Sequence, residues 1–228
     1  MSFIVKNTTF PNVLDLLAPH SCRGCGHIGE VLCDCCKNNI ISSRINLCPN
    51  CKSPNPTGNC PNCTHLPPTF IAGNRNDLIG KLIHDLKFFS VRALTKPLAE
   101  IMNASLPPIS HSVVIVPLPT ISPHIRQRGL DHTLLIAKHL TNLRPGWQTL
   151  PLLLRANNTV QVGASKLDRE IQATKAYMIN KRLSIDKTST YILLDDVWTT
   201  GSSMQAAYSK LQEAGATNIV MAILALSS

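Results

Sequence analysis

The sequence ILLDDVWTTGSS, residues 192–203, places an apolar run, two adjacent carboxylates and a hydroxyl-rich tract around one glycine. The apolar residues 191–194 predict a central strand, which brings Asp195 and Asp196 to its carboxyl end. There the carboxylates can accept hydrogen bonds from adjacent hydroxyls of a ligand, such as those of a ribose. Gly201 gives the next turn conformational freedom, and the free N–H groups of the helix behind it form a cradle for one phosphate. The stretch therefore predicts a site for a ribose 5-phosphate.

Residues 192–203 are also compatible with alternative roles. The two carboxylates could hold a divalent cation instead of a sugar. An ordinary strand-to-helix turn would also use Asp as a start signal and Ser as a cap. Trp198 could pack in the core or stack on a ligand. The ligand site is favoured because every position of LLDDVWTTGSS suits one physical role.

The chain from residue 112 onward predicts a parallel sheet. Short apolar runs alternate there with helical segments, in the order SVVIVPLP, LDHTLLIAKHL, TLPLLL, YILLDDV, MQAAYSKLQEAGA and NIVMAILAL. Strands that are buried on both faces and separated by helices are typical of a doubly wound α/β fold, in which ligands gather at the carboxyl ends of the strands. Ahead of them, HLPPTF predicts a connector. Residues 76–89 predict an amphipathic helix, and residues 93–104 predict a second helix that Pro97 opens or kinks.

All nine cysteines lie between Cys22 and Cys63, and eight of them form four C-x-x-C pairs. The pairs are Cys22 with Cys25, Cys33 with Cys36, Cys48 with Cys51, and Cys60 with Cys63. Two such turns complete a tetrahedral zinc site, so we expect one site from the first two pairs and a second from the last two. A crossed arrangement or a single site with spare thiols stays open. Cys35 could replace Cys33 or Cys36.

Composition and charge favour a globular protein with an anionic ligand. Hydrophobic residues make up 44% of the chain, and Lys and Arg outnumber Asp and Glu by 22 to 13. A net charge of +9 suits a phosphate ester or a nucleic acid. The N-terminus lacks the pattern of a secretory signal, which predicts a cytoplasmic location. Because that compartment is reducing, zinc binding is favoured over disulfides, and four repeated pairs disfavour a redox motif.

The motifs taken together resemble one known family. Residues 192–203 look like the phosphoribosyl pyrophosphate (PRPP) signature of type I phosphoribosyltransferases. With the cysteine pairs, LIHDLKF, VPLP, RQRG, QVGAS and GATNIVMAILAL, nearly the whole chain resembles the ComF (competence protein F) family. The resemblance implies a zinc-finger module over residues 1–66. It implies a type I phosphoribosyltransferase-like domain over residues 67–228, with a parallel sheet, flanking helices and a link to DNA uptake in natural transformation.

The resemblance also implies roles for particular residues. It implies that Asp195 and Asp196 contact the ribose hydroxyls. The residues implied to hold the 5-phosphate are Thr199, Thr200, Gly201, Ser202 and Ser203. The implied pyrophosphate loop is Pro117, Leu118, Pro119 and Thr120. Residues 155–176 match a mobile loop, and the implied catalytic side chains are Arg126, Arg128, Lys166 and Arg169.

The chain departs from the family pattern at two places. Where the family often has RGFNQ, this chain has Gly129, Leu130, Asp131 and His132 after Arg128. Where it often has LSRAERLANVRGAF, the differing residues are Ala164, Gln172, Ala173 and Lys175. These positions lie near the pyrophosphate and mobile loops, so the differences concern turnover more than phosphate binding.

Three functions follow as hypotheses. We expect a ComF-like cytoplasmic protein that binds PRPP and magnesium and helps to handle incoming single-stranded DNA. One alternative is a phosphoribosyltransferase that uses an unknown acceptor, such as a nucleobase or nucleotide. The other is an inert module that docks on a competence helicase. Aromatic residues are only 4% of the chain, so DNA binding would depend on backbone electrostatics more than on base stacking.

Overall fold

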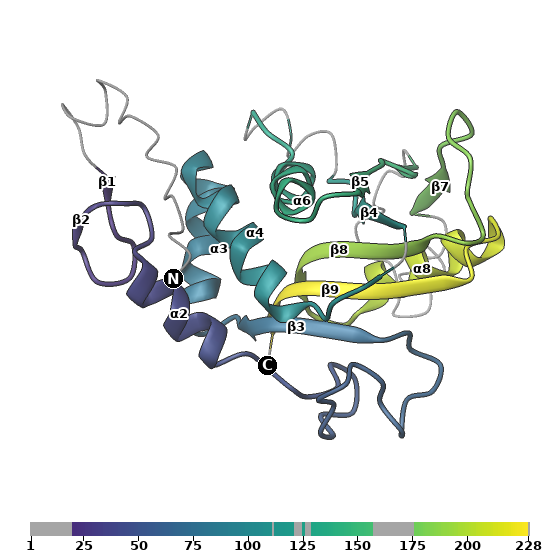
Figure 1. Ribbon diagram of the computed structural model, residues 1–228, viewed down its shortest axis with the longest axis horizontal. Coiled ribbons are helices and arrows are strands. Elements are labelled where there is room, and N and C mark those ends of the chain that lie inside the picture. The colour runs from purple at the N-terminus through teal and green to yellow at the C-terminus, as the bar shows by residue number, and fades with distance from the viewer. Residues whose placement is uncertain (1–19, 111, 121–124, 126–128, 157–175, 228) are drawn as a thin grey trace, which may run out of the picture.

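A parallel sheet of five strands is the centre of the structure (Figure 1). The computed structural model describes residues 20–110, 112–120, 125, 129–156 and 176–227. The strand order is β3-β9-β8-β4-β5, and every neighbouring pair is parallel. The strands are β3 (Thr69–Asn74), β4 (Val113–Pro117), β5 (Trp147–Thr149), β8 (Thr190–Trp198) and β9 (Asn218–Leu226). The prediction of an α/β fold with a parallel sheet is confirmed.

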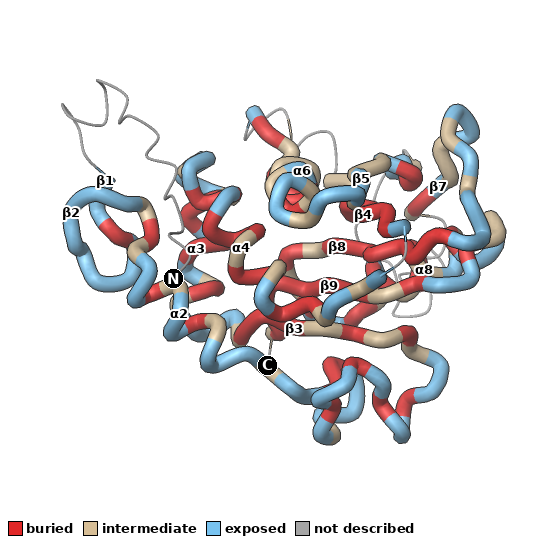
Figure 2. Tube along the Cα trace, viewed as in Figure 1, coloured by how far each residue is buried: buried red, intermediate tan, exposed pale blue. Residues whose placement is uncertain are grey.

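Helices cover both faces of this sheet. They are α3 (Leu78–Phe88), α4 (Thr95–Ser105), α6 (His132–Leu143) and α8 (Ser202–Glu213). Ile192 and Leu194 of β8 pack in the core that α3, α4 and α6 share, whereas Tyr191 and Leu193 pack in the core that contains α8. All four side chains are buried (Figure 2), which explains why this strand is a continuous apolar run instead of an alternating one.

The two helices predicted ahead of the sheet are present with shifted ends. Helix α3 begins at Leu78 because Asn74 and Asp77 form a turn, in which the N–H of Asn76 donates to Asn74 Oδ1 at 2.9 Å. A short 3-10 helix, η1 (Arg92–Leu94), precedes α4. Pro97 therefore lies in the first turn of α4, where an N–H group makes no hydrogen bond within the helix. The absence of this group in proline costs the helix no hydrogen bond.

Two strands differ from the sequence-based prediction. The run TLPLLL is divided: β5 joins the main sheet, while β6 (Leu153–Arg155) pairs antiparallel with β7 (Tyr177–Ile179) in a separate sheet. Pro151 lies between the two halves and cannot donate to a ladder. The segment HLPPTF was interpreted only as a connector, but its last two residues begin the edge strand β3. Residues 157–175 of the predicted mobile loop lie outside the described residues.

The cysteine-rich segment packs directly on the α/β domain. It contains a two-stranded ladder, β1 (His20–Ser21) with β2 (Ile28–Gly29), followed by helix α2 (Asp34–Ser42). Leu32 and Ile40 belong to the same buried cluster as the apolar face of α3. This segment therefore shares its apolar core with the larger domain. Among the described residues, no helix is both long enough and apolar enough to cross a membrane.

The unit formed by β8, a turn and α8 positions the predicted ligand site. Strand β8 continues past Leu194 to Trp198 because β9 pairs with it up to Leu226, while β4 stops opposite Leu194. The two carboxylates of β8 thus lie beyond the end of β4. Gly201 adopts a left-handed φ of 77°, and α8 begins at Ser202, slightly earlier than predicted. Trp198 is 2% exposed, so it is a core residue beneath the turn and not a stacking surface.

Gly201→Ala should destabilise the protein more than Gly146→Ala. A Cβ at Gly201 would lie 2.1 Å from Cζ2 of Trp198, whereas a Cβ at Gly146, which has a φ of 87°, would meet nothing within 4 Å. Both variants carry the left-handed strain of about 1–2 kcal/mol, and only Gly201→Ala adds about 1–3 kcal/mol of overpacking. Urea unfolding measures the two costs. Equal losses would contradict the close packing of Trp198 under the turn.

Candidate functional site

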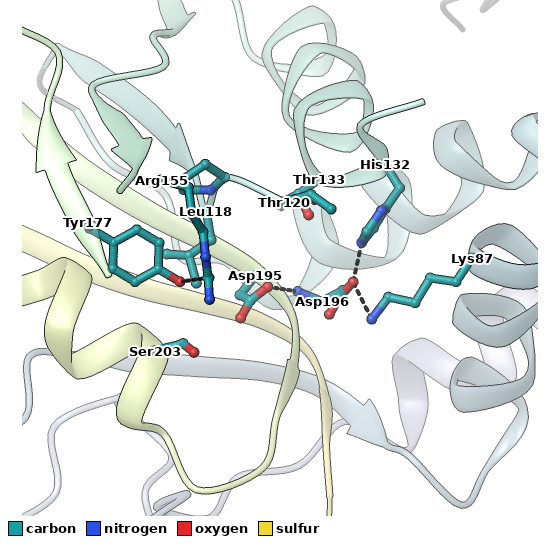
Figure 3. A pocket seen from close by; sticks show the side chains of 11 residues that line it. Lys87, Leu118, Thr120, His132, Thr133, Arg155, Tyr177, Asp195, Asp196 and Ser203 are labelled. Atoms are coloured by element: carbon teal, nitrogen blue, oxygen red, sulfur yellow. Dashed lines mark hydrogen bonds and ion pairs between the residues drawn. The ribbon is translucent and has the colours of Figure 1, made fainter. Parts of the chain in front are cut away.

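A cavity of about 290 Å³ opens where β4 and β8 end (Figure 3). The sequence-predicted residues that line it are Leu118, Pro119, Thr120, Asp195, Asp196 and Ser203. The residues that line it without having been predicted as ligand contacts are Lys87, His132, Thr133, Arg155 and Tyr177. Two predicted elements, the segment after β4 and the acidic pair of β8, are therefore brought together at one opening, as expected for the carboxyl ends of parallel strands.

The acidic pair is held by a defined set of contacts. The N–H of Asp196 donates to Asp195 Oδ1 at 2.8 Å. Lys87 Nζ lies 2.7 Å from Asp196 Oδ2. The Nε2 atom of His132 is hydrogen-bonded to the same oxygen. Lys87 comes from the last turn of α3 and His132 from the first turn of α6, so two helices meet the end of β8 at this carboxylate (Figure 3).

These contacts give the two carboxyl groups different protonation states. Burial, together with the charge of Asp196, raises the pKa of Asp195 to about 8. Burial also acts against the charge of Asp196, but the hydrogen bond from His132 and the ammonium of Lys87 outweigh it and hold the pKa of Asp196 well below its usual range. At neutral pH the pair therefore carries one negative charge and one proton, which matches the expectation for adjacent buried carboxyl groups.

The opposite wall of the cavity is formed by the β6–β7 pair. Arg155 donates a hydrogen bond of 3.0 Å to the hydroxyl of Tyr177, and its guanidinium lies 5.2 Å from the centre of the Tyr177 ring. Figure 3 places this guanidinium beside Asp195. The acidic centre is thus flanked by Lys87 on one side and by Arg155 on the other. Such an arrangement suits a ligand with both hydroxyl and anionic groups.

The hydroxyl-rich turn lies next to the acidic pair. Thr200 and Ser202 contact each other through their hydroxyls at 2.9 Å, and Thr199, Thr200 and Ser203 are exposed. Ser203 alone of residues 199–203 lines the cavity. The first turn of α8 starts here, and the N–H groups at the start of a helix are suited to bind an anion.

The predicted pyrophosphate segment is tied to the neighbouring elements. Pro117 is the last residue of β4, and the N–H of Leu118 donates to the carbonyl of Leu194 at 2.9 Å. Thr120 donates to Asp131 Oδ1 at 3.4 Å, and Asp131 caps α6. The side chains implied as catalytic lie outside the described residues; these are Arg126, Arg128, Lys166 and Arg169.

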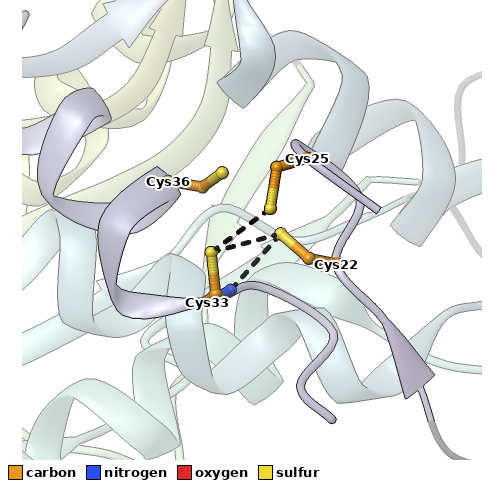
Figure 4. A group of neighbouring side chains, drawn as sticks. All are labelled: Cys22, Cys25, Cys33 and Cys36. Carbon is orange, nitrogen blue, oxygen red and sulfur yellow. Dashed lines mark hydrogen bonds between the residues drawn. The ribbon is translucent and has the colours of Figure 1, made fainter. Parts of the chain in front are cut away.

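The cysteines form two further candidate sites. The sulfurs of Cys22, Cys25, Cys33 and Cys36 lie within 4.8 Å of one another (Figure 4). The same holds for Cys48, Cys51, Cys60 and Cys63. These two groups are the predicted ones, and Cys35 belongs to neither. Each group could hold a metal ion such as zinc.

The sulfur spacing fits a tetrahedral zinc ion. Four sulfurs about 2.3 Å from zinc lie about 3.8 Å apart. Cys33 Sγ is 3.6 Å from the sulfurs of Cys22 and Cys25, and Cys51 Sγ is 3.4 Å from that of Cys60. Burial and neighbouring thiols raise the pKa of Cys36 to about 12. A bound metal ion would displace this proton and hold the thiol in its deprotonated form, so metal binding at this group should weaken at low pH.

Comparisons with known proteins provide no independent assignment. No model of a protein family matches the chain, and no curated protein sequence matches it either. The function is therefore argued from the motifs and from the geometry of the cavity.

Cys22→Ser and Cys48→Ser should each remove about one zinc ion per chain and lower the free energy of unfolding, because each breaks a different four-sulfur group. Elemental analysis of the purified protein measures the metal, and urea unfolding measures the stability. The matched control is Cys35→Ser, which alters an exposed cysteine outside both groups. Loss of zinc in the control, or two ions retained in Cys22→Ser, would contradict this assignment.

Asp195→Asn should make the stability less dependent on pH. The pKa of Asp195 is about 8 in the folded protein and about 4 in an unfolded chain. Between these values the folded state binds more protons, so the wild type loses stability as the pH rises from about 4 to about 8. As the pH rises over this range, the unfolding free energy of the wild type should therefore fall relative to that of the variant, as measured in urea. A constant difference would contradict the raised pKa.

Proposed function

We propose that the cavity binds PRPP with magnesium, and that the protein is ComF-like and serves the handling of incoming single-stranded DNA in the cytoplasm. The observation that carries the proposal is the acidic pair. Asp195 and Asp196 lie at the end of a central strand and line one polar cavity together with Ser203, which belongs to the hydroxyl-rich turn at the start of α8. A diol and a phosphate on one small molecule would satisfy both features.

The unequal protonation of the carboxyl groups suits a vicinal diol. The ionised Asp196 accepts hydrogen bonds only, whereas a protonated Asp195 can donate one and accept another. Adjacent ribose hydroxyls, which donate and accept, match this pair. The 5-phosphate would then lie at residues 199–203, where exposed hydroxyls and the N–H groups of α8 are available.

The pyrophosphate group would lie along the segment after β4. Leu118, Pro119 and Thr120 line the cavity on that side. When bound, magnesium would neutralise the charge of the pyrophosphate, held mostly by oxygens of the ligand. Arg155 and Lys87 add positive charge on two walls, and the resemblance adds Arg126, Arg128, Lys166 and Arg169.

A second candidate function is phosphoribosyl transfer to an unknown acceptor. It is favoured by Arg155 and Tyr177, which form a polar wall of the cavity that holds the acidic pair. In such a reaction the bond between the anomeric carbon and pyrophosphate breaks and a bond to the acceptor forms. Release of pyrophosphate that requires an added nucleobase or nucleotide would distinguish this function from binding alone.

The DNA-handling part of the proposal rests on charge. A net charge of +9 suits the phosphate backbone, and the low aromatic content disfavours base stacking. Affinity for single-stranded DNA should therefore fall steeply with salt and depend little on sequence.

Calorimetric titration with PRPP and magnesium tests the binding site. The wild type should bind saturably, and the Asp195→Asn, Asp196→Asn double variant should bind at least about tenfold more weakly, because charged and donated hydrogen bonds are lost. Glu213→Gln is the control, since its side chain is 62% exposed on α8 and far from the acidic pair in sequence. Zinc content and circular dichroism confirm that all three proteins are folded. No binding by a folded, zinc-loaded wild type would refute the proposal.

A further inference from the structure

Asp196 is held by two side chains that belong to none of the ligand-binding segments predicted from the sequence. Lys87 Nζ and His132 Nε2 both contact Asp196 Oδ2, the first at 2.7 Å. The contact between His132 and Asp196 joins residues 64 positions apart. In Figure 3 the two side chains reach the carboxylate from separate helices.

The surroundings of the imidazole define its tautomer. His132 is 3% exposed, and within the part of the chain that the structure describes its buried Nδ1 has no hydrogen-bond partner. A proton on Nδ1 would leave a buried donor unsatisfied, which is costly, whereas a proton on Nε2 is used in the bond to Asp196. The contact with Asp196 therefore uses a proton on Nε2, and the charge of Asp196 is balanced by Lys87.

Both donors use the same carboxylate oxygen. The hydrogen bond of His132 and the ion pair of Lys87 fall on Oδ2 of Asp196. The backbone N–H of Asp196 is in turn bound to Asp195 Oδ1, so the strand is fixed at this residue. This arrangement restricts rotation of the carboxylate and, as far as the described residues show, leaves Oδ1 of Asp196 to accept from a molecule in the cavity.

We propose that His132 and Lys87 are positioning residues of the ligand site: His132 fixes the Asp196 carboxylate through its Nε2–H donor, and Lys87 balances its charge. Oδ1 is thereby directed to a ligand hydroxyl. This inference rests on the proposed sugar-phosphate function of the cavity. It goes beyond that function in assigning roles to two residues to which the sequence motifs assigned none.

A purely structural role for His132 makes different predictions. If the ring only filled space, an apolar side chain of similar size would serve. If it positions Asp196, the replacement must carry a donor at the same place. Glutamine can supply a neutral N–H donor, and leucine cannot. His132→Gln and His132→Leu are therefore the informative pair, with Lys87→Met as a variant at a partly exposed position.

The tautomer can be measured without a ligand. Long-range proton–nitrogen NMR spectra of the zinc-loaded full chain distinguish the two neutral tautomers and the imidazolium, and His132→Gln identifies the signals of His132 among the eight histidines. We expect a proton on Nε2 and a changed Nε2 signal in Asp196→Asn. An Nε2 atom without a proton, or an unchanged signal, would overturn this inference and leave the proposed function intact.

Titration with PRPP and magnesium tests the positioning role. His132→Gln should bind within about threefold of the wild type, and His132→Leu and Lys87→Met should bind about tenfold or more weakly, as expected for a lost hydrogen bond to a charged group. Circular dichroism and zinc content must match those of the wild type. Equal affinity of His132→Leu and wild type would overturn the positioning role and leave the proposed function intact. A wild type that binds no PRPP would overturn the proposed function and, with it, this role.

Discussion

A charged carboxylate at the end of a buried strand is the constraint around which the site is arranged. Asp196 is 7% exposed, and an unpaired charge at such a position would be strongly destabilising. Lys87 and His132 supply the compensating contacts, so α3 and α6 have to converge on the end of β8. The contacts that compensate the charge of Asp196 also fix the orientation of its carboxylate. The same atoms therefore contribute to the stability of the fold and to the geometry of the ligand site.

The cysteine-rich segment contacts α3, the helix that carries Lys87. Arg23, between the first two cysteines, lies 3.7 Å from the buried Asp85, and Lys81 donates to the carbonyl of Arg23 at 2.9 Å. Helix α2 is linked to α4 through Lys37 and Glu100 at 2.7 Å. A metal ion in the first cysteine group would therefore stabilise the helix that carries Lys87. The first cysteine group and the acidic pair are thus both in contact with α3.

Local patterns in the sequence predicted the features that depend on nearby residues. The C-x-x-C spacing predicted both four-sulfur groups, and the apolar runs predicted the parallel sheet with its acidic pair. Lys87 and His132 were not predicted as ligand-site residues, because their contact with Asp196 depends on how distant helices pack. The β6–β7 pair was missed because TLPLLL resembles one strand, although Pro151 divides it. Strand β3 was missed because its short run is preceded by two prolines that suggested a connector.

The most direct test of the central claim is a crystal structure of the full, zinc-loaded protein grown with PRPP and magnesium. The ribose hydroxyls should lie within hydrogen-bond distance of Asp195 and Asp196, with the 5-phosphate at residues 199–203. Lys87 and His132 should remain on Oδ2 of Asp196. A ligand bound elsewhere, or a cavity that stays empty at a saturating concentration of PRPP, would contradict binding of PRPP at the acidic pair.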